Sequence, residues 1–157
     1  KKDVLMIKST MYIATAILAL GFGSANAQTF NFESKSDTPV VVGGIGPDGG
    51  SYVGSYNTGN GVSTYADGSK LKSTSKCVSM MQPPNANIFA MHVACDVTRE
   101  ATIYTVAAGC NFMNKEKTET SCVGGLKGKA GKLEGRTGSI TWHTKGGISK
   151  GTGQWHE

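Results

Sequence analysis

The chain has 157 residues, of which 22 are glycine, and it carries a formal net charge of +5. This length is enough for one domain with a single hydrophobic core. Its apolar runs fall well short of the roughly 20 residues of a membrane-spanning helix, and its basic residues lack the interleaved aromatic side chains of nucleic-acid surfaces, so both classes are excluded.

Residues 1–27 have the three parts of a secretory signal peptide. Three lysines lie among the first eight residues, an apolar run of 12 residues covers 11–22, and a small A-x-A pattern ends at Ala27. We therefore expect cleavage before Gln28; the alternative is an uncleaved N-terminal anchor. The mature domain, 28–157, would have a net charge of +3 after the loss of three Lys and one Asp. We expect it in the periplasm or outside the cell, where thiols oxidise.

The first predicted strand, 28–33, alternates Phe30 and Phe32 with polar residues. The next apolar run leads into Gly44-x-Gly46-x-x-Gly49, which has the spacing of a dinucleotide-binding turn. Such a turn must open a helix, but the residues that follow it are typical of strands and turns. Pro47-Asp48-Gly49 instead predicts a tight turn between two strands, and export of the chain argues against a nucleotide.

Further segments with period-two alternation follow, rich in Val, Ile, Thr and Tyr: 70–82, 86–108 and 139–144. Turn signals separate them, at 67–68, 83–85, 114–118 and 146–147. Within 87–98, one predicted face carries Phe89, Met91, Val93, Cys95 and Val97, and the other carries Ile88, Ala90, His92, Ala94 and Asp96. Strands at this spacing without crossover helices predict an antiparallel sheet, either closed as a barrel or stacked as a sandwich.

Four cysteines in an exported chain predict two disulfides, with three possible pairings. Cys77 and Cys95 are symmetric about Ala86, in the predicted turn that begins at 83. Cys110 and Cys122 are symmetric about Glu116, in the predicted turn at 114–118. Hairpin neighbours would bring each of these pairs together. Cys95 and Cys110 are also symmetric, about 99–103, but that choice leaves Cys77 with Cys122, three strands apart and too far for a disulfide. The third pairing would skip a strand each time. We predict Cys77–Cys95 and Cys110–Cys122, although closure of a barrel would also permit Cys77–Cys122. The spacings lack C-x-x-C pairs, so zinc is not expected, and a catalytic cysteine is the remaining alternative.

The segment after Cys122 is the most specific part of the sequence. Glycine recurs there at positions 124, 125, 128, 131, 135 and 138. No single face of a strand explains this spacing, which indicates bent strands and tight turns. The interspersed apolar residues Leu126, Leu133, Ile140 and Trp142 argue against a flexible linker.

The run G-G-x-x-G-K-x-G-K-x-x-G-x-x-G-S-x-x-W, followed by G-T-G-x-W at 151–155, resembles the closing region of allene oxide cyclase-like barrels, a fold shared with dirigent proteins. The resemblance covers roughly 77–155. It implies a single antiparallel barrel of about eight strands, lipocalin-like, with an apolar lumen. Members of this group bind or cyclise hydrophobic small molecules. The catalytic acid and base of such a cyclase have no clear match in this sequence, so fold alone does not decide function.

Three residues are candidates for ligand binding in such a lumen: His92, Tyr104 and Trp142. His92 has small neighbours that would leave space, but an outward-facing structural histidine is the alternative. Tyr104 and Trp142 are amphipathic aromatic residues suited to a pocket wall, or to the core. No metal site and no cofactor are predicted.

Three functions remain open on this sequence. The first is a non-catalytic exported barrel that binds a small hydrophobic ligand or serves an envelope role. The second is a cyclase or isomerase acting on a hydrophobic substrate in the lumen. The third is a surface interaction protein that uses its basic tail, with eight Lys or Arg against three Glu between 115 and 150, against an anionic envelope surface.

Overall fold

The computed structural model describes residues 28–45, 51–81 and 88–156. The predicted signal peptide, residues 1–27, lies outside the described residues. So do the predicted turn at Pro47-Asp48-Gly49 and the proline-rich turn at 83–85.

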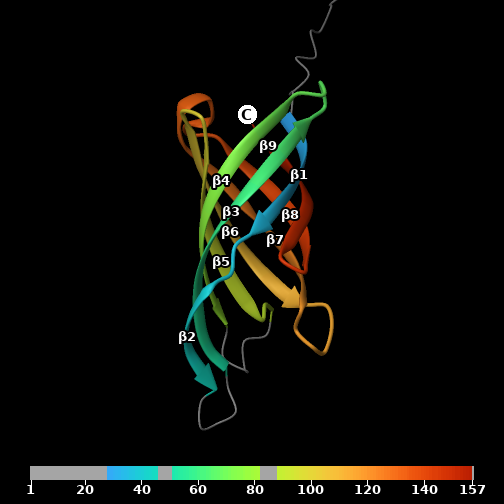
Figure 1. The fold of residues 1–157 in the computed structure, drawn as a ribbon. Helices are drawn as coiled ribbons and strands as arrows, with labels where there is room; N and C mark the ends of the chain where they lie inside the picture. Colours follow the sequence, from blue (N-terminus) through green and yellow to red (C-terminus); the bar gives the residue numbers. More distant parts are fainter. Residues whose placement is uncertain (1–27, 46–50, 82–87, 157) are drawn as a thin grey trace, which may run out of the picture.

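Nine antiparallel strands form one sheet (Figure 1). They are β1 (Gln28–Ser36), β2 (Val40–Ile45), β3 (Ser51–Tyr65), β4 (Lys70–Met81), β5 (Met91–Arg99), β6 (Thr102–Phe112), β7 (Glu119–Ala130), β8 (Thr137–Lys145) and β9 (Ile148–Trp155). Because β1 pairs with both β9 and β3, eight of the strands close into a barrel. The predicted all-β barrel of about eight strands is confirmed.

Strand β2 stands outside the closed ring. It continues the line of β1 and pairs with the first part of β3, so that Val40 lies opposite Tyr56. Figure 1 shows β2 and its partner end of β3 projecting beyond the neighbouring strands. The residues after the glycine-rich run therefore form a strand rather than a helix, which rules out the dinucleotide-binding turn.

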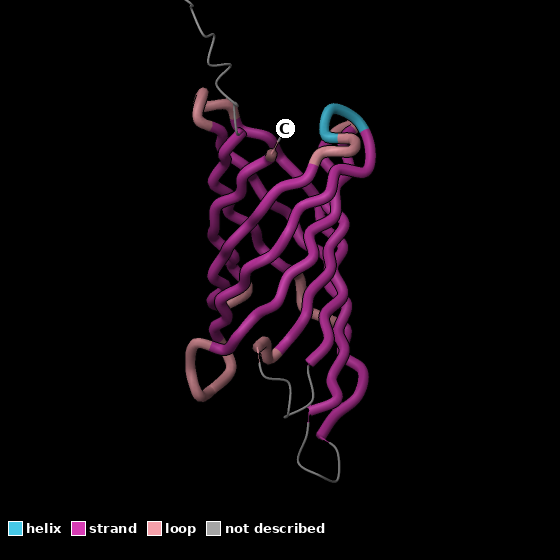
Figure 2. The backbone as a smooth tube through the Cα atoms, turned by 180° about the vertical axis from the view of Figure 1, so that it is seen from behind, coloured by secondary structure: helices cyan, strands magenta, loops and turns pink. Residues whose placement is uncertain are grey.

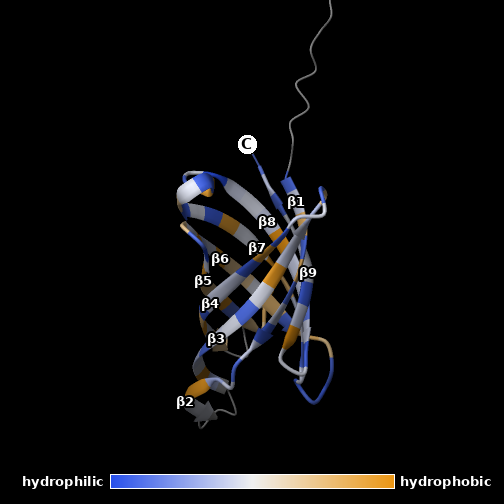
Figure 3. Ribbon diagram, turned by 45° about the horizontal axis from the view of Figure 1, so that its top comes forward, coloured by the Kyte–Doolittle hydropathy of each residue, from blue (hydrophilic) through white to orange (hydrophobic). Residues whose placement is uncertain are grey.

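Burial alternates from residue to residue along β4 and β5, as expected where one face of a strand meets the lumen and the other meets solvent. Hydrophilic and hydrophobic residues also follow one another along the strands in Figure 3. One end of the barrel, where β3 ends and β4 begins, is filled with buried apolar side chains. This plugged end is built from Phe30, Tyr65, Val97, Tyr104, Val106, Leu126, Leu133, Ile140 and Trp155. It lies next to the C-terminus in Figure 1 and carries the single 3-10 turn, Gly131–Leu133, in Figure 2. Leu133 reaches the core from that turn.

Both predicted disulfides are present. Cys77 of β4 lies opposite Cys95 of β5, and Cys110 of β6 lies opposite Cys122 of β7. The Cα atoms of the two pairs are 4.0 Å and 4.1 Å apart. Each bridge joins hairpin neighbours and faces the lumen, as symmetry about the turns predicted.

Most of the tail glycines, with Gly125 as the exception, occur where a side chain would collide or where the backbone turns. A Cβ atom at Gly128 would lie 1.6 Å from the carbonyl oxygen of Leu133. Gly131 opens the 3-10 turn with φ of +72°, a conformation that glycine adopts without steric cost. These constraints come from a short loop that folds back over β7, which is why no single strand face explained the spacing.

One predicted face is wrong at its start. Phe89 was grouped on one face with Met91 and Val93, but β5 begins only at Met91. The Phe89 ring packs against Gly109 on the outer surface, because Asn111 hydrogen-bonds the backbone of 88–90 and holds it out of strand geometry. In the described ranges we find no helix with the length and hydropathy to cross a bilayer.

Candidate functional site

A cavity of about 640 Å³ lies inside the barrel. Inward side chains from all eight closed strands line it. It extends from the plugged end toward the opposite end of the barrel, where Asp37, Pro39 and Lys117 border it. This volume is within the range of about 300–1,000 Å³ that small-molecule sites occupy.

One wall of the cavity consists of small polar side chains from β1, β3 and β4. We call it the serine wall; its members are Ser34, Ser36, Ser55, Asn57, Ser63, Ser73, Ser75 and Ser79. The strand registers align Ser34, Gly61 and Ser73 in one row and Ser36, Gly59 and Ser75 in another, so that a glycine of β3 lies between hydroxyls of β1 and β4 in both rows. The wall is therefore mostly polar, with Glu33 as the one charged residue that these three strands add to the described lining.

Glycines in β3 allow the hydroxyls to approach the backbone. A Cβ atom at Gly59 would lie 3.1 Å from the Oγ of Ser75, and one at Gly61 would lie 3.4 Å from the Oγ of Ser73. A larger residue at either position would displace these hydroxyls or fill the space in front of them.

Several of these hydroxyls are left without a protein partner. Ser55 and Ser79 hydrogen-bond each other, with their oxygens 2.6 Å apart. Within the part of the chain that the structure describes, the side chains of Ser63, Ser73 and Ser75 bond no other protein group. Ser73 and Ser75 are half-buried and line the cavity, whereas Ser63 also lines it but is only 3% exposed and so offers a ligand less surface.

Apolar side chains cover the strands across the barrel. Val93 and Val97 of β5, Val106 of β6, and Ile140 and Trp142 of β8 line the cavity. The order of the strands around the ring places β6–β8 opposite β1, β3 and β4. The lumen is therefore mostly hydroxyl-bearing on one side and mostly apolar on the other, although Phe30 and Phe32 of β1 and Thr120 and Thr144 of β7 and β8 also line it.

A buried arginine lies among the aromatic residues of the plugged end. Arg99 is 5% exposed, and its guanidinium donates a hydrogen bond to the hydroxyl of Tyr65. The guanidinium carbon also lies 5.4 Å from the ring centre of Tyr65 and 5.6 Å from that of Tyr104. Among the described residues, no carboxylate forms an ion pair with Arg99, and Arg99 does not line the cavity.

The phenol of Tyr104 stays neutral across the physiological range. Burial raises the pKa of Tyr104 to about 12, and the nearby charge of Arg99 acts in the opposite direction. The Tyr104 ring packs edge-on against Trp155, with ring centres 5.3 Å apart. Such a phenol can donate a hydrogen bond, but its pKa is far from that of an acid or base working near neutral pH.

The three predicted ligand-binding residues fall in different places. Tyr104 and Trp142 line the cavity. His92 is exposed on the outer surface, where its ring lies 5.7 Å from that of Phe89. His92 thus takes the outward-facing alternative and does not contribute to the lumen.

Sequence reasoning missed the serine wall. Serines at every second position, as at 73, 75 and 79, look like the solvent-facing side of a strand. On β4, however, the alternate positions 70, 72 and 76 are lysines, which need water more strongly than serine does. That contrast was the available signal that the serines face inward.

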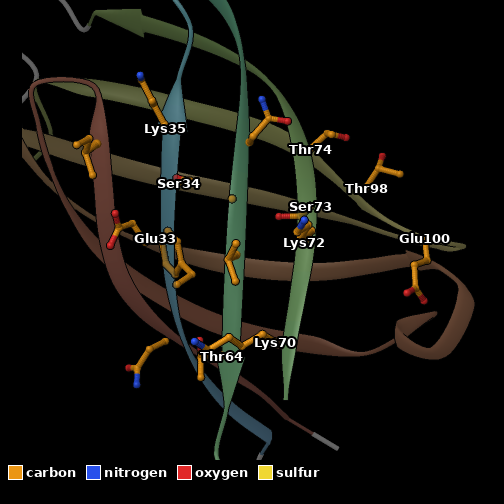
Figure 4. A pocket seen from close by; sticks show the side chains of 16 residues that line it. Glu33, Ser34, Lys35, Thr64, Lys70, Lys72, Ser73, Thr74, Thr98 and Glu100 are labelled. Atoms are coloured by element: carbon orange, nitrogen blue, oxygen red, sulfur yellow. The ribbon is translucent and has the colours of Figure 1, made fainter. Parts of the chain in front are cut away.

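A second depression, of about 1160 Å³, lies on the outer surface over β1, β3 and β4 (Figure 4). Lys70, Lys72 and Glu100 are among the charged side chains at its border. Glu33, also at this border, forms an exposed ion pair with Lys150 at 3.0 Å. We take the lumen as the candidate site, because its lining converges from eight strands, whereas solvated charges border the depression.

Among the described residues, no three His, Cys, Asp or Glu side chains gather closely enough to hold a metal ion. No protein-family model matches the chain, and no curated protein sequence matches it. The resemblance to allene oxide cyclase-like barrels therefore stays a prediction from the tail motif.

Proposed function

We propose that this protein is a non-catalytic, exported barrel that binds a small hydrophobic molecule in its lumen. The observation that carries the proposal is the cavity of about 640 Å³ with an apolar wall that includes Val106, Ile140 and Trp142. Burying hydrocarbon against such a wall contributes about 25 cal/mol per Å² of apolar surface removed from water. The cost of immobilising the ligand offsets part of this gain.

Two features support export. Residues 1–27 have the pattern of a cleavable signal peptide, and all four cysteines are in disulfides. Disulfides persist in oxidising compartments and are rare in the cytosol. We therefore place the mature protein, beginning at Gln28, in the periplasm or outside the cell.

The cyclase alternative lacks comparable support. The titratable groups that line the described cavity are Tyr104, with a pKa of about 12, and the charged residues Glu33, Asp37 and Lys117. Glu33 is paired on the outer surface, and the other two border the cavity at the end away from the plug. A cyclase would need a general acid or base near the apolar wall, where the hydrophobic substrate would lie.

Native mass spectrometry of protein purified from its host tests the proposal. We expect a co-purifying small molecule in the wild-type spectrum. The variant Ser75→Trp puts an indole into the cavity and should lose that molecule. The matched control Thr74→Trp puts the same indole on the outer surface of the same strand and should retain it.

Circular dichroism of both variants establishes that each barrel is folded. A wild-type spectrum without any bound molecule, together with no binding of apolar probes, contradicts the proposal. Equal retention of the ligand by Ser75→Trp and Thr74→Trp would place the binding site outside the lumen.

A further inference from the structure

We infer that the lumen selects an uncharged, facially amphipathic ligand, with hydroxyl or carbonyl groups along one side and hydrocarbon along the other. This inference rests on the proposed function and specifies its ligand class. It follows from the distribution of hydroxyl groups around the cavity, most of which lie on β1, β3 and β4, while Thr120 and Thr144 add hydroxyls near the end away from the plug.

The serine wall supplies hydrogen bonds along the length of the ligand. Ser63, Ser73 and Ser75 carry hydroxyls that bond no other described protein group, and each hydroxyl can both donate and accept. A purely hydrocarbon ligand would cover these groups without replacing the water they contact, which carries a free-energy penalty. A ligand with oxygens on that side would replace those bonds.

The opposite wall requires hydrocarbon. Val106, Ile140 and Trp142 face the serine wall across the lumen and offer little to a polar group. A molecule that is polar all round would leave its own hydroxyls unpaired against this wall. A rigid ring system with two unlike faces satisfies both walls at once.

Charge is disfavoured on the ligand. Among the described residues that line the cavity, the charged ones are Glu33, Asp37 and Lys117. None of these lies at the plugged end, and the buried guanidinium of Arg99 is occupied by Tyr65 and screened by aromatic rings. A carboxylate or ammonium group drawn deep into the lumen would lose its hydration without gaining a counter-ion.

Three related steroids separate these requirements. Methyl cholate is uncharged and carries three hydroxyls on one face. Methyl 5β-cholanate has the same skeleton and ester but no hydroxyls, and cholate has the hydroxyls together with a carboxylate. By isothermal titration calorimetry, we expect methyl cholate to bind at least about tenfold more tightly than either relative, since one or two net hydrogen bonds correspond to that ratio.

Substitutions in the wall test whether the hydroxyls cause the preference. The triple variant Ser63→Ala/Ser73→Ala/Ser75→Ala should weaken methyl cholate binding by roughly tenfold and leave methyl 5β-cholanate unchanged or slightly tighter. Thr74→Ala, on the outer side of β4, should change neither affinity. Thermal unfolding of each variant establishes that the barrel remains intact.

The outcomes distinguish this inference from the proposed function. If methyl 5β-cholanate binds as tightly as methyl cholate, and Ser75→Trp blocks both, the lumen binds ligands but the serine wall does not select them. Tighter binding of cholate than of its methyl ester would overturn the exclusion of charge. If none of the three binds at millimolar concentration while an apolar probe does bind, the ligand class is contradicted and the proposed function stands. If the apolar probe fails as well and no molecule co-purifies, both are contradicted.

Discussion

Arg99 donates a hydrogen bond to the hydroxyl of Tyr65, 34 positions earlier in the chain. Arg99 is the last residue of β5, and Tyr65 is the last residue of β3. The bond therefore ties two strands that are not neighbours, across β4, at the plugged end of the barrel. The same guanidinium lies over the ring of Tyr104 in β6, so a single side chain links three strands.

Tyr65→Phe tests how much this link stabilises the barrel. The substitution keeps the ring but removes the acceptor, leaving a buried, charged N–H group without its partner. We expect the free energy of unfolding in urea to fall by about 1–3 kcal/mol. Tyr56→Phe, an exposed tyrosine on the same strand, should change it by less than about 0.5 kcal/mol.

A double-mutant cycle with Arg99→Met assigns the effect to the pair. Once the arginine is gone, the loss of the Tyr65 hydroxyl should cost much less, giving a coupling of about 1 kcal/mol or more. Additive losses would show that the hydrogen bond contributes nothing and that Tyr65 acts through packing alone.

The pKa of Tyr104 predicts a loss of stability in alkali. The unfolded chain releases this proton near the ordinary pKa of 10.0, whereas the folded chain holds it to about 12. The contribution of the neutral Tyr104 phenol to the free energy of unfolding is therefore fully present below pH 10, and it is lost as the pH rises through 12. Tyr104→Phe should show a shallower decline of unfolding free energy over this interval than the wild type.

An ultraviolet titration of phenolate absorbance provides the direct check. The phenolate of Tyr104 should form near pH 12 in the wild type, and Tyr104→Phe should lack this contribution to the absorbance. A difference spectrum between the two proteins that titrates near pH 10 would contradict the assignment.

The two disulfides should differ in their sensitivity to reductant. Cys110 and Cys122 are 0% and 4% exposed, whereas Cys77 and Cys95 are half-buried. Because thiol–disulfide exchange requires access to a sulfur atom, dithiothreitol should reduce Cys77–Cys95 first in the folded protein. Alkylation followed by peptide mass mapping measures the order, and both bridges should be reduced together in urea. Faster reduction of Cys110–Cys122 would be the opposite of this expectation.

Substitution by alanine at two glycines of β7 should change the free energy of unfolding to different extents. At Gly128, a methyl group would meet the carbonyl oxygen of Leu133, and neither backbone segment can move freely. We expect Gly128→Ala to lower the free energy of unfolding by more than about 2 kcal/mol. At Gly125 the nearest atom to an added methyl group, the oxygen of Gly138, is 3.8 Å away. Gly125→Ala should therefore be neutral or slightly stabilising.

Thermal denaturation of these two variants beside the wild type measures the contrast. Similar transition temperatures for Gly128→Ala and Gly125→Ala would mean that the loop over β7 yields to an added methyl group.

Much of the fold could be predicted from local pattern. Period-two alternation and the turn signals identified strands such as β4, β5 and β8, and symmetry about the turns paired Cys77 with Cys95 and Cys110 with Cys122. These features depend on neighbours along the chain, so the sequence contains them directly. Phe89 was placed on the wrong face because the backbone of 88–90 is held by Asn111, more than 20 positions away.

By itself, the sequence determined that the chain forms antiparallel strands joined in hairpins, cross-linked in two places. Only the tertiary structure decided which face of each strand lies inside the closed ring. Closure brings β1 against β3 and β9, so serines from three strands meet as one wall opposite Val106 and Trp142. The alternation of polar and apolar residues along a strand is the same whether its polar face meets bulk water or an enclosed cavity. Only closure of the barrel determines which of these two environments the polar face meets.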